Sequence, residues 1–178
     1  MSATDDGTVS RYEVPPESPF ALLDDHDIRA WYAFMKVQLR LRYEMNRQLR
    51  DDSGISLADY DVLVALTSES NGTMTISDLA IRIGAERSRI SHQARRMATQ
   101  GLIALQPNPD DRRATDVALT DDGRALLVRA SPGHIDFVRS VFFDALNPQQ
   151  GAQLAEAFEN IYELLIAHGS LPRPTDRP

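Results

Sequence analysis

The spacing of apolar residues changes at Gly101 of this 178-residue chain, and the change restricts the folds that the chain can adopt. Before Gly101, apolar residues recur every three or four positions, as they do on one face of an α-helix. After it come two short stretches rich in β-favouring or alternating residues, LIALQ (102–106) and ATDVALT (114–120). The segment PNPDDRR between them has the composition of a turn. The chain is therefore predicted to be mainly helical with one small antiparallel β-hairpin.

Six helices are predicted around this hairpin, and their first or capping residues are Ile28, Ser56, Thr75, Glu86, Thr120 and Asn147. Ser56 and Thr75 are each followed three residues later by an aspartate, which is the spacing of a helix-capping pair. The third helix is expected to end at Gly84. Pro132 and the glycine after it are expected to kink or interrupt the fifth helix, because proline cannot donate a backbone hydrogen bond.

Positive charge is concentrated in residues 84–113, although the formal net charge of the whole chain is -7. This segment holds six arginines against three acidic residues, whereas residues 1–27 hold one arginine against seven acidic residues. Arginines that neutralise phosphates release counterions, so such a basic segment is a candidate contact surface for a polyanion. An ordinary exposed helix and turn is the alternative, and charge alone does not decide between the two.

Several classes of protein are excluded by residues that the chain lacks. It has no cysteine, which excludes disulfides, Cys-ligated zinc and thiol-based redox switches. Its four histidines lack metal-site spacing, and no metal or other cofactor is predicted. No GxSxG, HExxH, P-loop or Rossmann motif occurs, so the chain is not expected to be an enzyme. The absence of a long apolar run and of a signal-like amino terminus predicts a cytoplasmic protein without a membrane partner.

The fourth predicted helix has two different faces. Ile90, Ala94 and Met97 form an apolar stripe suited to the core. The opposite side is small, polar or basic, and its residues are Ser88, Arg89, His92, Gln93 and Arg96. The order of the predicted elements is that of a winged helix-turn-helix. A helix is followed by a short helix, a glycine-containing turn, a polar and basic helix, and a hairpin with arginines at its tip.

The polar face of this helix suits the major groove of double-stranded DNA. Arginine and glutamine can form bidentate hydrogen bonds with guanine and adenine, and Ser88 and Ser91 are small enough to allow close approach. At the predicted wing tip, Arg113 can enter a narrow minor groove, where negative potential is focused. Asp111, two residues earlier, can accept the guanidinium of Arg113 and orient it. A solvated turn with self-cancelling charges is the alternative for this DDRR sequence.

Three stretches of the chain resemble a known family: LADYDVLVAL, TISDLAIRIGAERSRISHQARRMATQGLI and PDDRRATDVALTDDGRALL. Their order and spacing are similar to those of the multiple antibiotic resistance regulator (MarR) family of winged-helix transcription factors. The resemblance covers roughly residues 27–167. The stretches RSRISHQARRM and PGHIDFVR (132–139) are similar to a branch of this family that is frequent in actinobacteria.

The resemblance implies a homodimer that binds double-stranded DNA at a pseudo-palindromic site, most simply as a repressor. Residues 24–54 and 121–168 would form the helical dimerisation region, and residues 55–120 the DNA-binding lobe. The prolines of the two ends of the chain independently predict a flexible acidic arm at residues 1–23 and a flexible tail at residues 169–178. The DNA-facing residues that the resemblance implies are Thr75, Ser77, Ser88, Arg89, Ser91, His92, Gln93, Arg96, Asp111, Arg112 and Arg113. Among them, Thr75 and Ser77 are expected to contact phosphates.

The resemblance also implies a small-molecule effector that binds between the dimerisation and DNA-binding regions. Trp31, Met35 and Tyr60 are candidates for lining its cavity, and the alternative for these side chains is the core or the dimer interface. Many relatives carry Arg or Lys where this chain has Leu105-Gln106. This departure keeps open a second function, that of a winged-helix module which binds protein and not DNA. The acidic arm is either a solvated tail or a competitor with DNA for the arginines.

Overall fold

The computed structural model describes residues 14–174 and divides into two compact units, residues 1–43 and 44–178. In the first unit, the 3-10 helix η1 (Pro19–Leu22) precedes the long helix α1 (Asp25–Ser53), whose last turns belong to the second unit. The rings of Phe20 and Tyr32 meet edge to face, with 5.8 Å between their centroids. Residues 14–23 thus contain a helical turn within the segment predicted to be a flexible arm. The rest of that arm, residues 1–13, lies outside the described residues.

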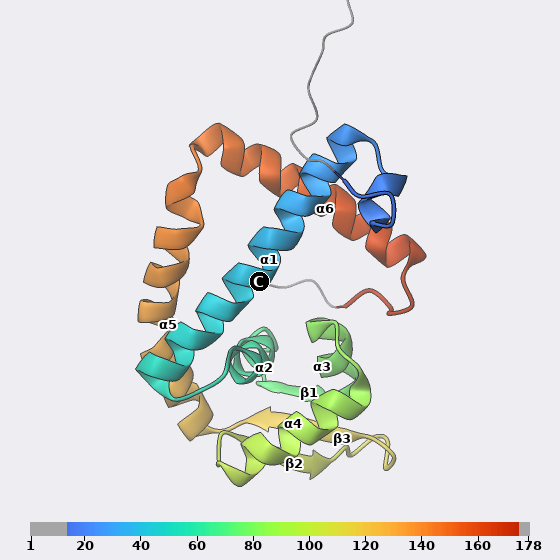
Figure 1. Ribbon diagram of the computed structural model, residues 1–178. Helices are drawn as coiled ribbons and strands as arrows, with labels where there is room; N and C mark the ends of the chain where they lie inside the picture. The colour runs from blue at the N-terminus through green and yellow to red at the C-terminus, as the bar shows by residue number, and fades with distance from the viewer. Residues whose placement is uncertain (1–13, 175–178) are drawn as a thin grey trace, which may run out of the picture. The chain divides into compact units, whose positions relative to one another are not determined.

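The second unit contains the remaining helices and all the strands in the described part of the chain (Figure 1). In chain order they are α2 (Leu57–Thr67), β1 (Thr73–Thr75), α3 (Ile76–Ile83), α4 (Arg87–Thr99), β2 (Ile103–Pro107), β3 (Thr115–Leu119), α5 (Asp121–Val141), the 3-10 helix η2 (Phe143–Ala145) and α6 (Pro148–His168). The predicted fold class, mainly helical with a small β wing, is confirmed.

The sheet is antiparallel and has the strand order β1-β3-β2. The predicted hairpin is formed by β2 and β3, in a register that pairs Ile103 with Leu119. The edge strand β1 was not predicted from the sequence. It consists of three residues, too few to show a period of two, and its strand conformation depends on pairing Thr73 with Ala118 of β3.

Side-chain caps begin α2 and α3 where the sequence predicts. Ser56 and Asp59 form a reciprocal capping box at α2, and the side chain of Thr75 accepts the amide of Asp78 at α3. The Oδ1 of Asn46, on α1, accepts the amide of Leu57 at 3.0 Å and so ties the end of α1 to the start of α2. Gly84 ends α3 with φ at +70°, a conformation that glycine adopts without steric cost.

The core of the lobe lies between α2, α3, α4 and the sheet. Ile90, Ala94 and Met97 of α4 are at most 1% exposed, which confirms the apolar stripe predicted for this helix. The other fully buried side chains of this core are Leu49, Val62, Leu63, Leu66, Leu79, Ile103 and Val117. Burial of a side chain of this size stabilises the fold by about 1.5–3 kcal/mol, so the apolar face of α4 alone fastens it firmly to the lobe.

The fifth helix, α5, runs from Asp121 to Val141 with Pro132 inside it, so of the two effects predicted for this proline, a kink or an interruption, the interruption is wrong. Side-chain contacts hold the helix on both sides of the proline. The hydroxyl of Tyr60 on α2 is hydrogen-bonded to that of Ser131 at 3.1 Å. The Nδ1–H of His134, which is 5% exposed, donates to the Oε1 of Gln48 on α1 at 2.8 Å. These tertiary contacts offset the hydrogen bond that Pro132 cannot make.

The last helix, α6, presents an apolar surface that the described chain does not bury. None of its residues from Pro148 to His168 is buried. Its exposed large apolar side chains are Phe158, Ile161, Tyr162, Leu164 and Leu165, each 41–63% exposed. Among the residues that the structure describes, no helix is both long and apolar enough to cross a membrane. In the segment predicted to be a flexible tail, Arg173 forms an ion pair with Glu163 of this helix.

The start of α5 is joined closely to the base of the hairpin. Thr120 caps α5 by accepting the amide of Gly123 and also donates to the carbonyl of Gly101, at 3.0 and 2.7 Å. Gly123 lies directly against the backbone of Leu102, and a Cβ atom at this position would overlap the Leu102 carbonyl oxygen. The wing and the first turn of α5 can approach this closely only because residue 123 has no side chain.

We therefore expect Gly123→Ala to lower the free energy of unfolding by about 1–3 kcal/mol, because the added methyl group must displace backbone. Gly151→Ala is a matched control, since Gly151 is also helical and a Cβ there meets nothing within 4 Å. The control should be neutral or more stable by up to about 1 kcal/mol, the difference in helix propensity. Urea unfolding followed by circular dichroism measures both. Equal stability of the two variants would contradict the proposed close contact.

Candidate nucleic-acid interface

The outer face of α4 carries side chains that are free to meet a ligand. Ser88, Arg89 and His92 are exposed, and Ser91 is partly exposed. Within residues 14–174, none of these four side chains has a hydrogen-bond or ion-pair partner. They lie at spacings of three and four, so they form one continuous polar strip along the helix.

The other two residues predicted on this face, Gln93 and Arg96, are held by a carboxylate of α2. Arg96 donates from Nη1 to the Oδ2 of Asp59 at 3.2 Å and from Nη2 to its Oδ1, which makes the ion pair bidentate. Gln93 donates from Nε2 to the same Oδ1 at 3.3 Å. The structure thus gives both residues a partner inside the lobe, while the Arg96 side chain remains 51% exposed.

Asp59 is only 3% exposed, and sequence reasoning identified it only as half of a helix cap. Its Oδ2 accepts the hydroxyl of Ser56 at 2.6 Å and the amide of Ser56 at 3.4 Å. Burial by itself would raise the pKa of Asp59, but hydrogen bonds from Arg96 and Ser56 outweigh it and hold this pKa below its ordinary value. The carboxylate is therefore charged at neutral pH.

The start of α3 carries Thr75 and Ser77, the predicted phosphate contacts. Thr75 caps the helix: its hydroxyl accepts the amide of Asp78 at 3.1 Å and donates to the Asp78 carboxylate at 2.7 Å. The exposed hydroxyl of Ser77 accepts the Nε–H of Arg87, on α4, at 3.1 Å. Both hydroxyls thus connect local elements, and Ser77 helps to hold α3 and α4 together.

The wing tip is organised by Asn108. Its Oδ1 accepts the amides of Asp110 and Asp111 at 2.9 and 2.8 Å, and its Nδ2 donates to the Oδ1 of Asp116 at 2.8 Å. The predicted contact from the Arg113 guanidinium to Asp111 is not formed. Asp111 instead accepts the backbone N–H of Arg113 at 2.9 Å, because a short side chain in a tight turn reaches the amide two residues ahead.

This turn leaves Arg112 and Arg113 exposed at the tip of the hairpin. Helix α4 contacts β2, so the polar strip of α4 and the wing belong to adjoining elements of the lobe (Figure 1). Just before the tip, Leu105 packs against the core of the lobe and Gln106 is exposed. The packing of Leu105 accounts for an apolar residue in this part of β2.

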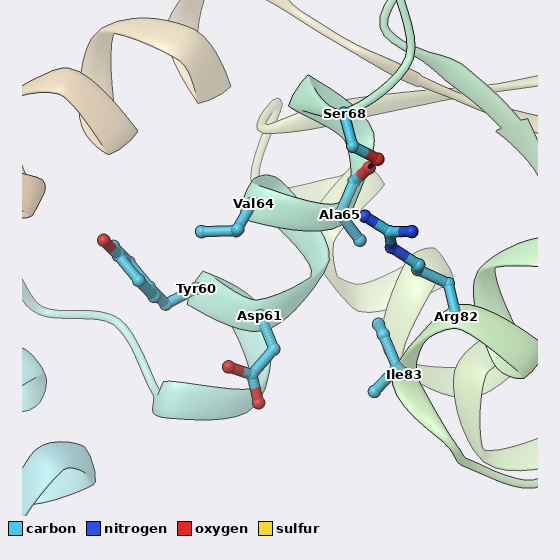
Figure 2. Close-up of a pocket in the computed structure, with 7 residues that line it drawn as sticks. All are labelled: Tyr60, Asp61, Val64, Ala65, Ser68, Arg82 and Ile83. Carbon is cyan, nitrogen blue, oxygen red and sulfur yellow. Dashed lines mark hydrogen bonds between the residues drawn. The ribbon is translucent and has the colours of Figure 1, made fainter. Parts of the chain in front are cut away.

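A cavity of about 290 Å³ lies between α2 and α3. Its lining residues are Tyr60, Asp61, Val64, Ala65, Ser68, Arg82 and Ile83. Figure 2 shows that Arg82 extends from α3 toward the Ser68 end of α2, whereas Asp61 lies on the first part of α2. The cavity thus has apolar walls and opposite charges from two helices. Of the three predicted lining residues, Tyr60 is in this set, and Trp31 and Met35 belong to the other unit of the chain.

Asp24, His26 and Asp27 bring potential metal ligands together before and within the first turn of α1. All three are exposed, and the contacts among them account for their arrangement. The Oδ1 of Asp24 accepts the amide of Asp27 at 2.8 Å as a helix cap, and His26 lies beside the carboxylate of Asp27. This cluster is a capped helix start.

Comparison with known proteins gives a family match for the region described above. Residues 53–114 match a family model described as the MarR family. They extend from the end of α1 to the wing tip and include every predicted DNA-facing residue. Among related sequences, the HTH-type transcriptional repressor MdtR of Bacillus subtilis (strain 168) is 30% identical over 102 residues. The match covers 57% of this chain and 61% of MdtR, which is less than two thirds of that relative.

Two solved structures from Streptomyces coelicolor match over more of their length. Sco3205, a MarR family transcriptional regulator solved in complex with DNA, has a TM-score of 0.79 and 31% identity over 84% of this chain and 94% of its own. AbsC, a MarR family transcriptional regulator, has a TM-score of 0.77 and 31% identity over 82% of this chain and 98% of its own. The similarity therefore extends well beyond the winged lobe.

The lowered pKa of Asp59 predicts a pH dependence for the stability of this chain. Because the folded pKa lies below that of an unfolded aspartate, about 3.9, the stabilisation is present above that pH and is lost as pH falls through the folded pKa. Asp59→Asn should therefore destabilise the chain at neutral pH, and the difference from the unmodified chain should shrink below about pH 4. Urea unfolding at a series of pH values measures the difference.

Asp110→Asn, at the exposed wing tip, is the matched control and is expected to follow the unmodified chain at every pH. A destabilisation by Asp59→Asn that stays constant down to about pH 2 would show that the charge of the carboxyl group is not the source of the stability.

Proposed function

Because the chain belongs to the MarR family of transcriptional regulators, we propose that it binds a pseudo-palindromic operator as a homodimer and represses transcription. The observation that carries this proposal is the polar strip of α4, in which Arg89 and His92 have no partner within residues 14–174. Side chains of this kind on a helix of this fold read base edges in the major groove. The DNA-bound form of Sco3205 supports double-stranded DNA as the ligand.

Arg113 is proposed to enter the minor groove beside the site that α4 occupies. Its backbone is fixed by the Asp111 carboxylate and its side chain is exposed, so it can meet DNA without breaking an internal ion pair. Ser88 and Ser91 would permit close approach of α4 to the bases. Arg112 would contact the nearby DNA backbone. Thr75 and Ser77 would add phosphate contacts at the start of α3.

A second copy of the chain is the proposed partner of the apolar face of α6. This helix exposes Phe158, Ile161 and Leu165 at helical spacing, and a stable helix of this kind requires a covering surface. The described part of α1 in the first unit also exposes large apolar side chains, Trp31 and Phe34 among them. A two-fold dimer would present two winged lobes to successive half-sites, which accounts for a palindromic operator.

A protein-binding module without DNA contacts is the less favoured alternative, because the polar strip and the arginine wing are present and a similar protein was solved in complex with DNA. An enzymatic role is not proposed, since the named relatives are transcriptional regulators. The proposed binding to operator DNA agrees with the predicted cytoplasmic location.

Selection of bound fragments from random double-stranded DNA at near-physiological salt tests the proposal directly. We expect an enriched inverted repeat whose half-sites lie about one helical turn apart, the spacing of two lobes of a dimer. In the same experiment, Arg113→Ala should bind the selected operator roughly tenfold more weakly, the cost of one lost charged groove contact.

Arg129→Ala is the control for this variant, because it removes an exposed arginine from α5, away from the wing and α4. It should bind the operator like the unmodified chain. Recovery of no motif by folded dimeric protein would favour the protein-binding module. Unchanged affinity of Arg113→Ala would remove the wing from the interface.

The cavity between α2 and α3 is the proposed site of a small-molecule effector. Its apolar walls and the charges of Arg82 and Asp61 suit a mainly apolar molecule with a polar group. Such a ligand can shift the protein toward a form that does not fit DNA only by its differential affinity for the two forms. The effect must be reciprocal, so operator DNA should weaken binding of the ligand.

The fluorescent probe anilinonaphthalene sulfonate, an apolar ring system with an anionic group, tests this site. Val64→Trp should fill the cavity and weaken probe binding by at least about tenfold. Thr67→Trp, an exposed position on the same helix outside the lining set, should leave probe binding unchanged. Equal binding by the two variants, or binding that saturating operator DNA does not weaken, would contradict the proposed site.

A further inference from the structure

The residues of the outer face of α4 fall into two groups according to what they contact. Arg89 and His92 have no partner in the described chain, whereas Gln93 and Arg96 both donate to the carboxylate of Asp59. Arg89, His92 and Arg96 are exposed and lie away from the buried stripe, and the partly buried Gln93 lies at its edge. The ligand face of α4 therefore includes one pair of long side chains that is already engaged with α2.

The helix cap alone does not explain a carboxylate at this position. The capping box uses only the Oδ2 of Asp59, which accepts the hydroxyl and the amide of Ser56. The Oδ1 accepts Gln93 and Arg96 and has no role in the cap. A buried carboxylate without these donors would be left charged and poorly solvated, so the donors from α4 are needed where Asp59 is 3% exposed.

The geometry of this contact controls how α4 is presented. Apolar contacts through Ile90 and Met97 hold α4 to the lobe but tolerate small rotations and shifts, because they are not directional. A bidentate arginine–carboxylate pair fixes both distance and orientation. Asp59 lies in the first turn of α2, which is itself fastened to α1 through the contact between Asn46 and Leu57. A chain of hydrogen bonds thus leads from α4 through α2 back to α1.

We propose that Asp59 is the positioning residue of the DNA interface: through Arg96 and Gln93 it fixes the orientation of α4, and Ser88, Arg89 and His92 read the sequence. The proposal rests on the proposed function of the chain as a DNA-binding regulator. It changes the role expected for Arg96 and Gln93 from contacts with DNA to internal supports of the helix. Side chains that read base edges must be held to within a fraction of an ångström, and such support comes from residues behind them.

The competing role for Arg96 is a direct phosphate contact, since half of its side chain is exposed. The two roles differ in the salt dependence of binding. Each phosphate contact contributes about 0.9 to the slope of log affinity against log salt concentration. Loss of a phosphate contact therefore lowers this slope by about one for each bound lobe and weakens binding to all sequences. Loss of a positioning contact leaves the slope unchanged and weakens binding to the operator alone.

The test compares Asp59→Asn, Arg96→Met and the double variant, using the selected operator and an unrelated duplex of the same length at several salt concentrations. Each single variant should weaken operator binding about tenfold, equivalent to ~1.4 kcal/mol, and leave binding to the unrelated duplex and the salt slope unchanged. The double variant should bind the operator no more weakly than either single variant, because both changes break the same contact. Unfolding of the free protein is measured alongside.

Arg95→Met is the matched control, since it removes the charge of the neighbouring exposed arginine on the same helix. Any effect that it has should add to that of Asp59→Asn, because Arg95 does not contact this carboxylate. A lower salt slope for Arg96→Met, or additive losses in the double variant, would overturn the proposal. A third result would also overturn it: the effects of the two substitutions are non-additive in the free energy of unfolding but additive in the free energy of operator binding. That is the result expected for an ion pair that only stabilises the fold.

Arg96→Lys keeps the proposal testable if Asp59→Asn does not fold. Lysine retains the charge but cannot make the bidentate contact. The positioning role predicts that Arg96→Lys binds the operator as weakly as Arg96→Met, whereas a phosphate contact predicts that lysine restores most of the affinity. Failure of the proposed function itself is separate from these outcomes, because it would appear as a lack of any selected operator for the unmodified chain.

Discussion

The arrangement of the DNA-binding lobe depends on one carboxylate that stays charged inside the protein. Asp59 is 3% exposed, and a buried charge is tolerated only where hydrogen-bond donors replace the water that it has lost. Ser56 supplies donors from the cap of the same helix, which are present wherever α2 forms. Arg96 and Gln93 supply the others from α4, and these exist only when α2 and α4 have their native arrangement. The carboxylate thus links the local folding of one helix to the tertiary placement of another.

The helices of this chain could be predicted from sequence because their start signals act over short distances. Ser56 and Thr75 bond to amides three residues away, so sequence spacing contains the whole interaction. The features that were missed depend on distant partners. The strand β1 exists through pairing with β3, and α5 continues past Pro132 because Tyr60 and His134 take part in contacts that join it to α2 and α1. No local pattern contains these contacts.

The residues of the candidate site also differ in how far the sequence predicts their contacts. Helical periodicity identifies the side chains of α4 that lie away from the core, but it does not tell which of them meet another element of the lobe. Arg89 and Arg96 are equivalent by that criterion, and they differ only because a carboxylate of α2 lies within reach of Arg96. At the wing, two residues of separation predicted that Asp111 and Arg113 interact. Periodicity and spacing do not specify that the backbone amide, and not the guanidinium, would be the donor.

Helix α5 determines how a change at the proposed effector site can reach the wing. Its first turn is bonded to the base of the hairpin through Thr120, and its middle is bonded to α2 through the contact between Tyr60 and Ser131. Tyr60 also lines the cavity, so a ligand that moves this ring acts directly on the junction of α2 and α5. These two bonds attach the first half of α5 to the wing and to α2. In the proposed dimer through α6, the 3-10 turn from Phe143 to Ala145 is the junction that links α5 and the lobe to the dimer interface.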